Sequence, residues 1–211
     1  MTKNYLSPEA ERARRLYGGI MEEIKRRQKA MTDLLTGTVP PQPQIIVSEF
    51  CYLQLRFICE PIIIGCAVAH GDIEEVESRR FQKEWNAARL ANYLSKIHPE
   101  FYPRPTRQIL GSDGKVERIE NVTDGFLTLD ELKELYDEAG SRLHAGSAQS
   151  FRLGKRPEVD LKRIANWTGR IRRLLNHHCI QLIDPSFQIW TLMQAKGDGR
   201  VHINLFKKLP N

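Results

Sequence analysis

Arginine and histidine recur at one spacing near the end of a predicted helix. The pairs are Arg172 with His177 and Arg173 with His178, each with four residues between. Helical periodicity places Arg170, Arg173 and His177 on the polar side of that helix. It places Arg172 and His178 on opposite edges of the apolar side. An imidazole titrating near neutrality can transfer a proton while neighbouring guanidinium groups stabilise a phosphate, which is what RNA cleavage without a metal requires.

A second polar group lies at the end of an earlier predicted helix. Asp137, Ser141 and His144 are spaced by four and three residues, so they lie together beside its apolar face and can share a hydrogen-bond chain. A hydrolase triad is normally assembled from separate segments. His144 also has a simpler interpretation, as a last-turn cation that suits the helix dipole, with Gly146 as the left-handed cap.

Three charges follow one stripe of the most apolar predicted helix. Glu49, Arg56 and Glu60 fall within roughly 40° of each other at the 100° spacing of an α-helix. Buried charges are costly unless paired, so Arg56 and Glu60, four residues apart, are expected to pair. The stripe is either a structural ion-pair network at the solvent edge of the helix or the polar wall of a binding cleft.

The positive charge is concentrated in one segment. The chain carries 32 Lys and Arg against 26 Asp and Glu, a net charge of +6. Residues 151–178 contain eight basic and two acidic residues, so this segment accounts for the whole excess. Such a segment can bind a phosphate backbone, or it can be a solvated helix face. Trp167 is the main aromatic residue there that could stack on a base.

The elements that would position these residues are mostly helical. A stripe of apolar residues predicts a long first helix over 7–35, and Thr128 with Glu131 forms a capping box that begins the fourth helix. The sequence therefore predicts a mainly α fold, an antiparallel bundle of about five helices in a single domain, 1–211, with its core in 45–183. The expected elements are helices over 7–35, 45–70, 74–97, 129–146 and 160–183, a β-hairpin insertion over about 106–120, and a C-terminal β-hairpin over 186–207.

Several classes of function are excluded. The apolar run 45–69 is interrupted by charges, so no membrane span is expected, and the N-terminus has no export-signal pattern. The four cysteines are expected to be reduced, buried thiols of a cytoplasmic protein. The chain contains no glycine-rich phosphate loop and no dinucleotide fingerprint, so no cofactor is expected. Residues 120–131 partly match a calcium-binding loop, but Val122 occupies a ligand position, so no metal site is expected.

The repeated Arg-x4-His spacing on a late helix of a bundle resembles the HEPN superfamily of small helical domains. The run Ser141-Arg142-Leu143-His144 also looks like the helix ending of HEPN-like proteins that lack the usual motif. The resemblance covers about residues 45–183. It implies a homodimer that acts on RNA or a nucleotide, often as a metal-independent endoribonuclease in toxin–antitoxin or defence systems. The usual motif often has a polar residue directly after its arginine, whereas Arg173 is followed by Leu174.

Three hypotheses follow. The first is an HEPN-like protein that binds or cleaves RNA, in which His177 or His144 is the acid/base. Arg172, Arg173 or Arg142 then holds the phosphate. The expected binding residues are Glu49, Arg56, Glu60, Ser141 and Arg170. The second is a non-catalytic interaction module that docks through the first helix and the edge of the C-terminal hairpin. The third is a DNA-binding regulator, although no helix-turn-helix is visible.

Overall fold

The computed structural model describes residues 8–70, 86–143 and 159–207. The described helices are α1 (Pro8–Leu35), α2 (Gln44–Ala69), α5 (Ala87–Ile97), α6 (Leu129–Arg142) and α8 (Leu161–Leu175). The strands are β1 (Arg104–Leu110), β2 (Val116–Asn121), β3 (His177–Gln181), β4 (Phe187–Leu192) and β5 (His202–Lys207). The third predicted helix lies partly outside the described residues, and only its second half is seen, as α5.

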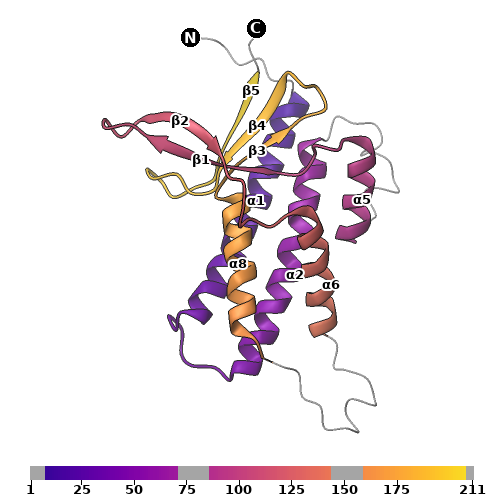
Figure 1. Cartoon of the computed structure of the whole chain (residues 1–211), viewed down its shortest axis with the longest axis vertical. Coiled ribbons are helices and arrows are strands. Elements are labelled where there is room, and N and C mark those ends of the chain that lie inside the picture. The colour runs from indigo at the N-terminus through magenta and orange to yellow at the C-terminus, as the bar shows by residue number, and fades with distance from the viewer. Residues whose placement is uncertain (1–7, 71–85, 144–158, 208–211) are drawn as a thin grey trace.

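The helices pack around α2 (Figure 1). Helix α1 descends along it, and α5, α6 and α8 contact its other sides. The apolar stripe of α1 is buried, as its spacing predicts, at Tyr17, Ile24 and Met31, and Met21 is buried beside them. Gly65 of α2 lets these two helices approach closely, since a Cβ there would lie 3.1 Å from the Tyr17 ring.

The β-strands form one antiparallel sheet in the order β2-β1-β3-β4-β5. The prediction of a mainly α bundle carrying two separate hairpins was therefore wrong, and the fold is mixed α and β. Both hairpins are present, but β3 joins them into a continuous sheet. The fifth predicted helix ends at Leu175 instead of Ile183, and after Asn176 the chain enters β3, all five residues of which are buried.

Helix α2 is the one helix in the described residues that is long and apolar enough to cross a membrane. Of its most apolar window, 56% is buried inside the protein. Burial of this kind is consistent with the core helix of a soluble protein, as its place among the other helices also indicates. The four cysteines are buried and form no disulfide with one another, and burial raises the pKa of the Cys51 thiol to about 11.

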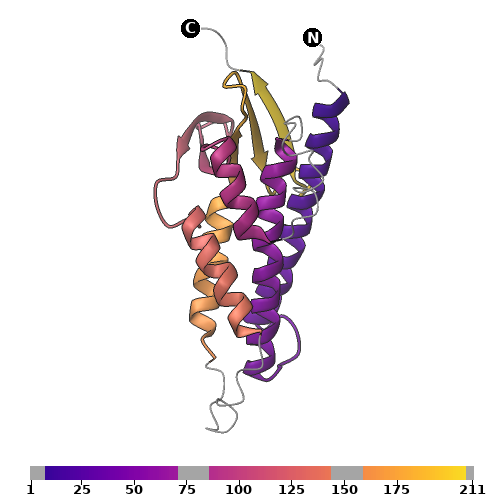
Figure 2. The ribbon, with the colours of Figure 1, turned by 90° about the vertical axis from the view of Figure 1, so that its right-hand side faces the viewer.

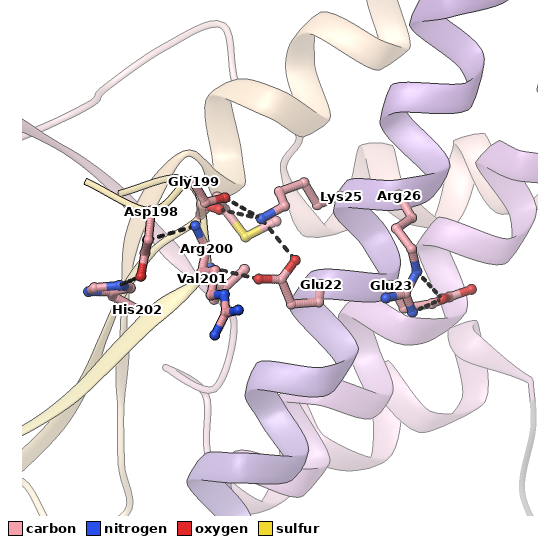
Figure 3. A network of polar contacts seen from close by, with 10 residues as sticks. Glu22, Glu23, Lys25, Arg26, Asp198, Gly199, Arg200, Val201 and His202 are labelled. Atoms are coloured by element: carbon pink, nitrogen blue, oxygen red, sulfur yellow. Dashed lines mark hydrogen bonds and ion pairs between the residues drawn. The ribbon is translucent and has the colours of Figure 1, made fainter. Parts of the chain in front are cut away.

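Helix α1 also fixes the end of the sheet (Figure 3). Glu22 accepts a hydrogen bond from the Val201 N–H at 2.7 Å, and Lys25 donates to the Gly199 carbonyl at 2.8 Å. Glu22 and Lys25 also pair with each other at 2.8 Å. These contacts join the loop between β4 and β5 to the middle of α1, so the last strand is held beside this helix.

Candidate functional site

The two histidines of the repeated motif lie on opposite faces of β3. His178 is on the inner face, where Nδ1 lies 2.8 Å from the Leu175 carbonyl and Nε2 lies 2.7 Å from the Tyr17 hydroxyl. A carbonyl only accepts, so Nδ1 carries the proton and the Tyr17 hydroxyl donates to Nε2. Burial lowers the pKa of His178 to about 4. His178 is therefore a neutral structural residue, closed off from solvent.

His177 is on the outer face of the sheet. Its Nδ1 lies 2.7 Å from the Thr106 hydroxyl, which in turn donates to the His177 carbonyl at 3.3 Å. The Gln108 amide nitrogen lies 3.4 Å from Nε2, an arrangement that leaves Nε2 as the acceptor and Nδ1 as the donor. Desolvation lowers the pKa of His177. This ring is held in one orientation and is neutral at physiological pH.

Two arginines of the motif region are paired with acidic residues near the start of α6. Arg170 contacts the Glu131 carboxylate. Arg173 donates to both the carboxylate and the carbonyl of Asp124, at 2.8 and 2.7 Å. The charge of the half-buried Arg170 is therefore neutralised within the chain. Arg173 and Asp124 are 51% and 82% exposed, so their pairing is weak and the Arg173 charge stays at the surface.

Arg172 takes a different direction from the histidines. Its guanidinium lies 3.5 Å from the Thr32 hydroxyl of α1. His177 contacts Thr106 of β1 on the outer sheet face. Arg172 and His177 therefore do not converge on one point, because the change from helix to strand after Leu175 breaks the spacing that would have aligned them.

Glu138 of α6 is the shared hydrogen-bond acceptor near the other end of α8. Its carboxylate accepts two hydrogen bonds from Arg163 at 2.7 Å, one from Tyr52 at 2.8 Å and one from Trp167 at 3.1 Å. Burial would raise the pKa of Glu138, but the hydrogen bonds from Arg163, Tyr52 and Trp167 outweigh it and hold the pKa below its usual value. This cluster joins α2, α6 and α8 and is saturated by its own partners.

The second sequence group does not form a catalytic chain in the described residues. Ser141 donates to the main-chain carbonyl of Asp137 at 3.0 Å, which is a common helix back-bond. Arg142 lies over the Tyr52 ring at 5.6 Å. His144 lies outside the described residues. Arg142 ends α6 near the start of α8, whereas His177 follows the end of α8, and a helix of this length separates the two by about 20 Å.

The charged stripe of α2 faces α6. Arg56 and Glu60 form the expected ion pair at 3.6 Å, and Arg56 donates to the Tyr136 hydroxyl at 2.8 Å while lying 4.2 Å over its ring. Tyr136 donates to Glu60 at 3.2 Å. A Cβ at position 140 would lie 2.8 Å from the Arg56 guanidinium, so Gly140 makes room for it. Glu49 is exposed on α2, about two helical turns before Arg56.

The outer face of the sheet carries a row of aromatic rings. The ring centroids of His177 on β3 and Trp190 on β4 are 5.7 Å apart. Those of Trp190 and Phe206 on β5 are 6.3 Å apart, in an edge-to-face arrangement. The exposure increases along the row, from 6% at His177 to 54% at Phe206. The strand register places three amide side chains on this same face: Gln108, Gln188 and Asn204. Gln188 donates to Gln181 at 2.9 Å and accepts from the Trp190 indole at 3.1 Å, so its amide is used within the sheet.

A cation completes this outer face. Arg104 of β1 is in register with Cys179, and Cys179 is in register with Trp190, so the three residues form one line across the sheet. Arg104 is exposed, and its acidic neighbour Glu100 is also exposed and 3.6 Å away, which makes their pairing weak. We define the outer sheet face as His177, Trp190, Phe206, Arg104, Gln108, Gln188 and Asn204.

Sequence reasoning missed this face, although one signal for it is present. Residues 187–194 and 200–206 alternate, and the alternation alone places Gln188 and Trp190 on one side of their strand and Asn204 and Phe206 on one side of theirs. The missing information was β3, which brings His177 beside Trp190. Searches against protein-family models, curated proteins and solved structures found no match to this chain.

Proposed function

We propose that the protein is a cytoplasmic, non-catalytic module that binds single-stranded RNA on the outer sheet face. The observation that carries the proposal is the pair of rings Trp190 and Phe206 on adjacent strands, with the Asn204 side chain on the same face. The buried His177 ring packs beside Trp190 and holds it in place. Aromatic side chains on an open sheet stack on unpaired bases, and amides bond base edges. The exposed cation Arg104 supplies a contact for a phosphate.

The arrangement favours binding over cleavage. His177 has its Nδ1 proton committed to Thr106, and its pKa is lowered, so it is a poor proton donor near neutral pH. Arg170 and Arg173, which would stabilise the charge of a phosphate, are paired with Glu131 and Asp124. The HEPN relationship, the homodimer and the setting in defence remain predictions, and the binding mode proposed here needs none of them.

The test measures the binding of a single-stranded RNA to the full chain in the presence of EDTA. The RNA has twelve nucleotides of mixed sequence and a fluorescein label, and its fluorescence anisotropy reports the bound fraction. We expect Trp190→Ala and Phe206→Ala each to weaken binding by about tenfold, since stacking contributes about 1–3 kcal/mol per base. Phe57→Ala is the matched control, because Phe57 is an exposed aromatic residue on α2. It should leave the affinity unchanged.

The same samples, run on a denaturing gel, separate binding from cleavage. Intact RNA together with losses confined to the sheet variants supports the proposal. Cleavage that is lost in His177→Ala would restore the nuclease hypothesis. Absence of RNA binding by the wild type, or equal losses in Phe57→Ala and Trp190→Ala, would remove the outer sheet face as an RNA site and favour a protein-interaction module.

A further inference from the structure

The last strand of the sheet has an open edge beside a helix. Strand β5 ends the strand order, and no described strand pairs with its outer side. Helix α1 runs alongside this edge (Figure 2). Between them is a groove of about 640 Å³, lined by Glu11 and Arg14 of α1 and by residues 203–207 of β5. A groove between a strand edge and a helix has the shape that receives one extended strand.

One contact in the groove shows which main-chain groups face it. Arg14 donates a hydrogen bond to the Ile203 carbonyl at 3.3 Å, from outside the sheet. In an antiparallel strand, the direction of the main-chain groups repeats every second residue. Leu205 and Lys207 therefore direct their N–H and C=O groups to the same side as Ile203. The edge offers these groups to a partner strand along the length of the groove.

The charge of the groove indicates the kind of strand. Arg14 and Lys207 are the two basic residues that line the groove, and Glu11, paired with Arg14 at 2.7 Å, is its one acidic residue, so the lining is positive by one charge. The first turn of α1 adds the positive end of its helix dipole. We propose that this groove binds an extended peptide with carboxylate side chains, which adds to the sheet as a sixth strand beside β5.

A peptide fits this edge better than a second copy of the chain does. Helix α1 forms the far wall of the groove, so the space beside β5 accepts one strand, whereas a second copy would bring its own sheet and its own α1. Two copies would also bring Arg14 and Lys207 of one chain against the same cations of the other. The groove shares Asn204 and Phe206 with the outer sheet face, but the peptide binds through the main-chain edge of β5, so this proposal does not depend on RNA binding.

The test uses the full chain and two fluorescein-labelled octapeptides, one of alternating valine and glutamate and one of alternating valine and lysine. We expect the glutamate peptide to bind measurably and the lysine peptide at least about tenfold more weakly. A glutamate peptide that is N-methylated at alternate residues, on the edge that would face β5, should also bind about tenfold more weakly. The latter comparison requires no protein variant, so it does not depend on the folding of a mutant.

Arg14→Glu and Arg12→Glu provide the matched pair, since both reverse one charge on α1 and Arg12 does not line the groove. We expect Arg14→Glu to lower the affinity for the glutamate peptide by about tenfold and Arg12→Glu to lower it by less than about threefold. The proposal is overturned by equal affinity for the two peptides, by indifference to N-methylation, or by equal effects of the two variants. A dimer in sedimentation at about 50 μM that Leu205→Pro dissolves would also overturn it, because the edge would then hold a second copy.

Discussion

The helical layer and the sheet layer differ in how far their polar side chains are paired within the chain. Between α2, α6 and α8, donors and acceptors meet inside the chain, as in the four hydrogen bonds that Glu138 accepts. On the outer face of the sheet the Phe206 ring and the Asn204 side chain are exposed, and the edge of β5 opens into a groove. The positive charge of residues 151–178 is therefore partly used inside the chain. Among its described members, Arg163 pairs with the partly buried Glu138 and Arg170 pairs with Glu131.

The largest effect that this comparison predicts is at Glu138. Glu138→Ala removes the acceptor for Arg163, Tyr52 and Trp167 and leaves partly buried donors without a partner. We expect a loss of about 3 kcal/mol in the free energy of unfolding. Urea denaturation followed by circular dichroism at 222 nm measures it.

Glu134→Ala is the control for that measurement. Glu134 is on the same helix, one turn earlier, and contacts the same Arg163 at 3.3 Å, but its side chain is 60% exposed. An exposed pair contributes less than about 1 kcal/mol. Equal losses in the two variants would show that the helical layer is not stabilised by its internal polar cluster, and the contrast with the sheet would disappear.

The next effect is at the junction of the two layers. Tyr17→Phe removes the hydroxyl that donates to His178 and leaves a buried imidazole nitrogen without its donor. We expect a loss of about 2 kcal/mol in unfolding free energy. Thermal and urea unfolding of this variant, compared with that of the wild type, measures the loss. A loss below about 0.5 kcal/mol would contradict the structural role given to the Tyr17–His178 pair.

The same pair predicts a pH dependence. Burial lowers the pKa of His178 to about 4, whereas an unfolded histidine titrates near 6.5. Between these values the unfolded chain binds more protons than the native chain, so stability falls as the pH falls from about 6.5 to 4 and is insensitive to this group above about 7.5. We expect a slope of up to about 1.4 kcal/mol per pH unit from His178, with a further contribution from His177.

Urea denaturation at pH 7.5, 6.0 and 5.0 tests this slope, and His178→Gln is the matched variant. Glutamine retains a donor and an acceptor but does not titrate. The slope should therefore decrease by about 1 kcal/mol per pH unit in the variant. An unchanged slope would mean that groups other than His178 govern the acid sensitivity.

Local signals in the sequence predicted much of the helical layer. The apolar stripe predicted α1, and the capping box at Thr128 and Glu131 predicted the start of α6. Both hydrogen bonds of that capping box are present. The end of α8 was not predictable in the same way. Residues 177–181 are buried on both faces of the sheet, so they show no alternation, and neither glycine nor proline separates them from the helix before them.

For the candidate site residues, too, contacts within one helix could be predicted from the sequence and contacts between elements could not. The pair Arg56 and Glu60 is four residues apart on one helix, so its spacing alone predicts the contact. The partners of Arg163, Arg170 and Arg173 come from α6 and the loop before it, and only the tertiary packing brings them together. Charge counted along the chain therefore overestimates the charge that α8 offers to a ligand.

The smallest predicted effect is on the outer sheet face itself. Phe206→Ser removes an aromatic ring that is 54% exposed, so we expect the free energy of unfolding to change by less than about 0.5 kcal/mol. Ile203→Ala, on the inner face of the same strand and against α1, should cost about 2–3 kcal/mol. If Phe206→Ser instead costs as much as Ile203→Ala, the ring is part of the core, and the outer sheet face is no more open to a ligand than the helical layer is.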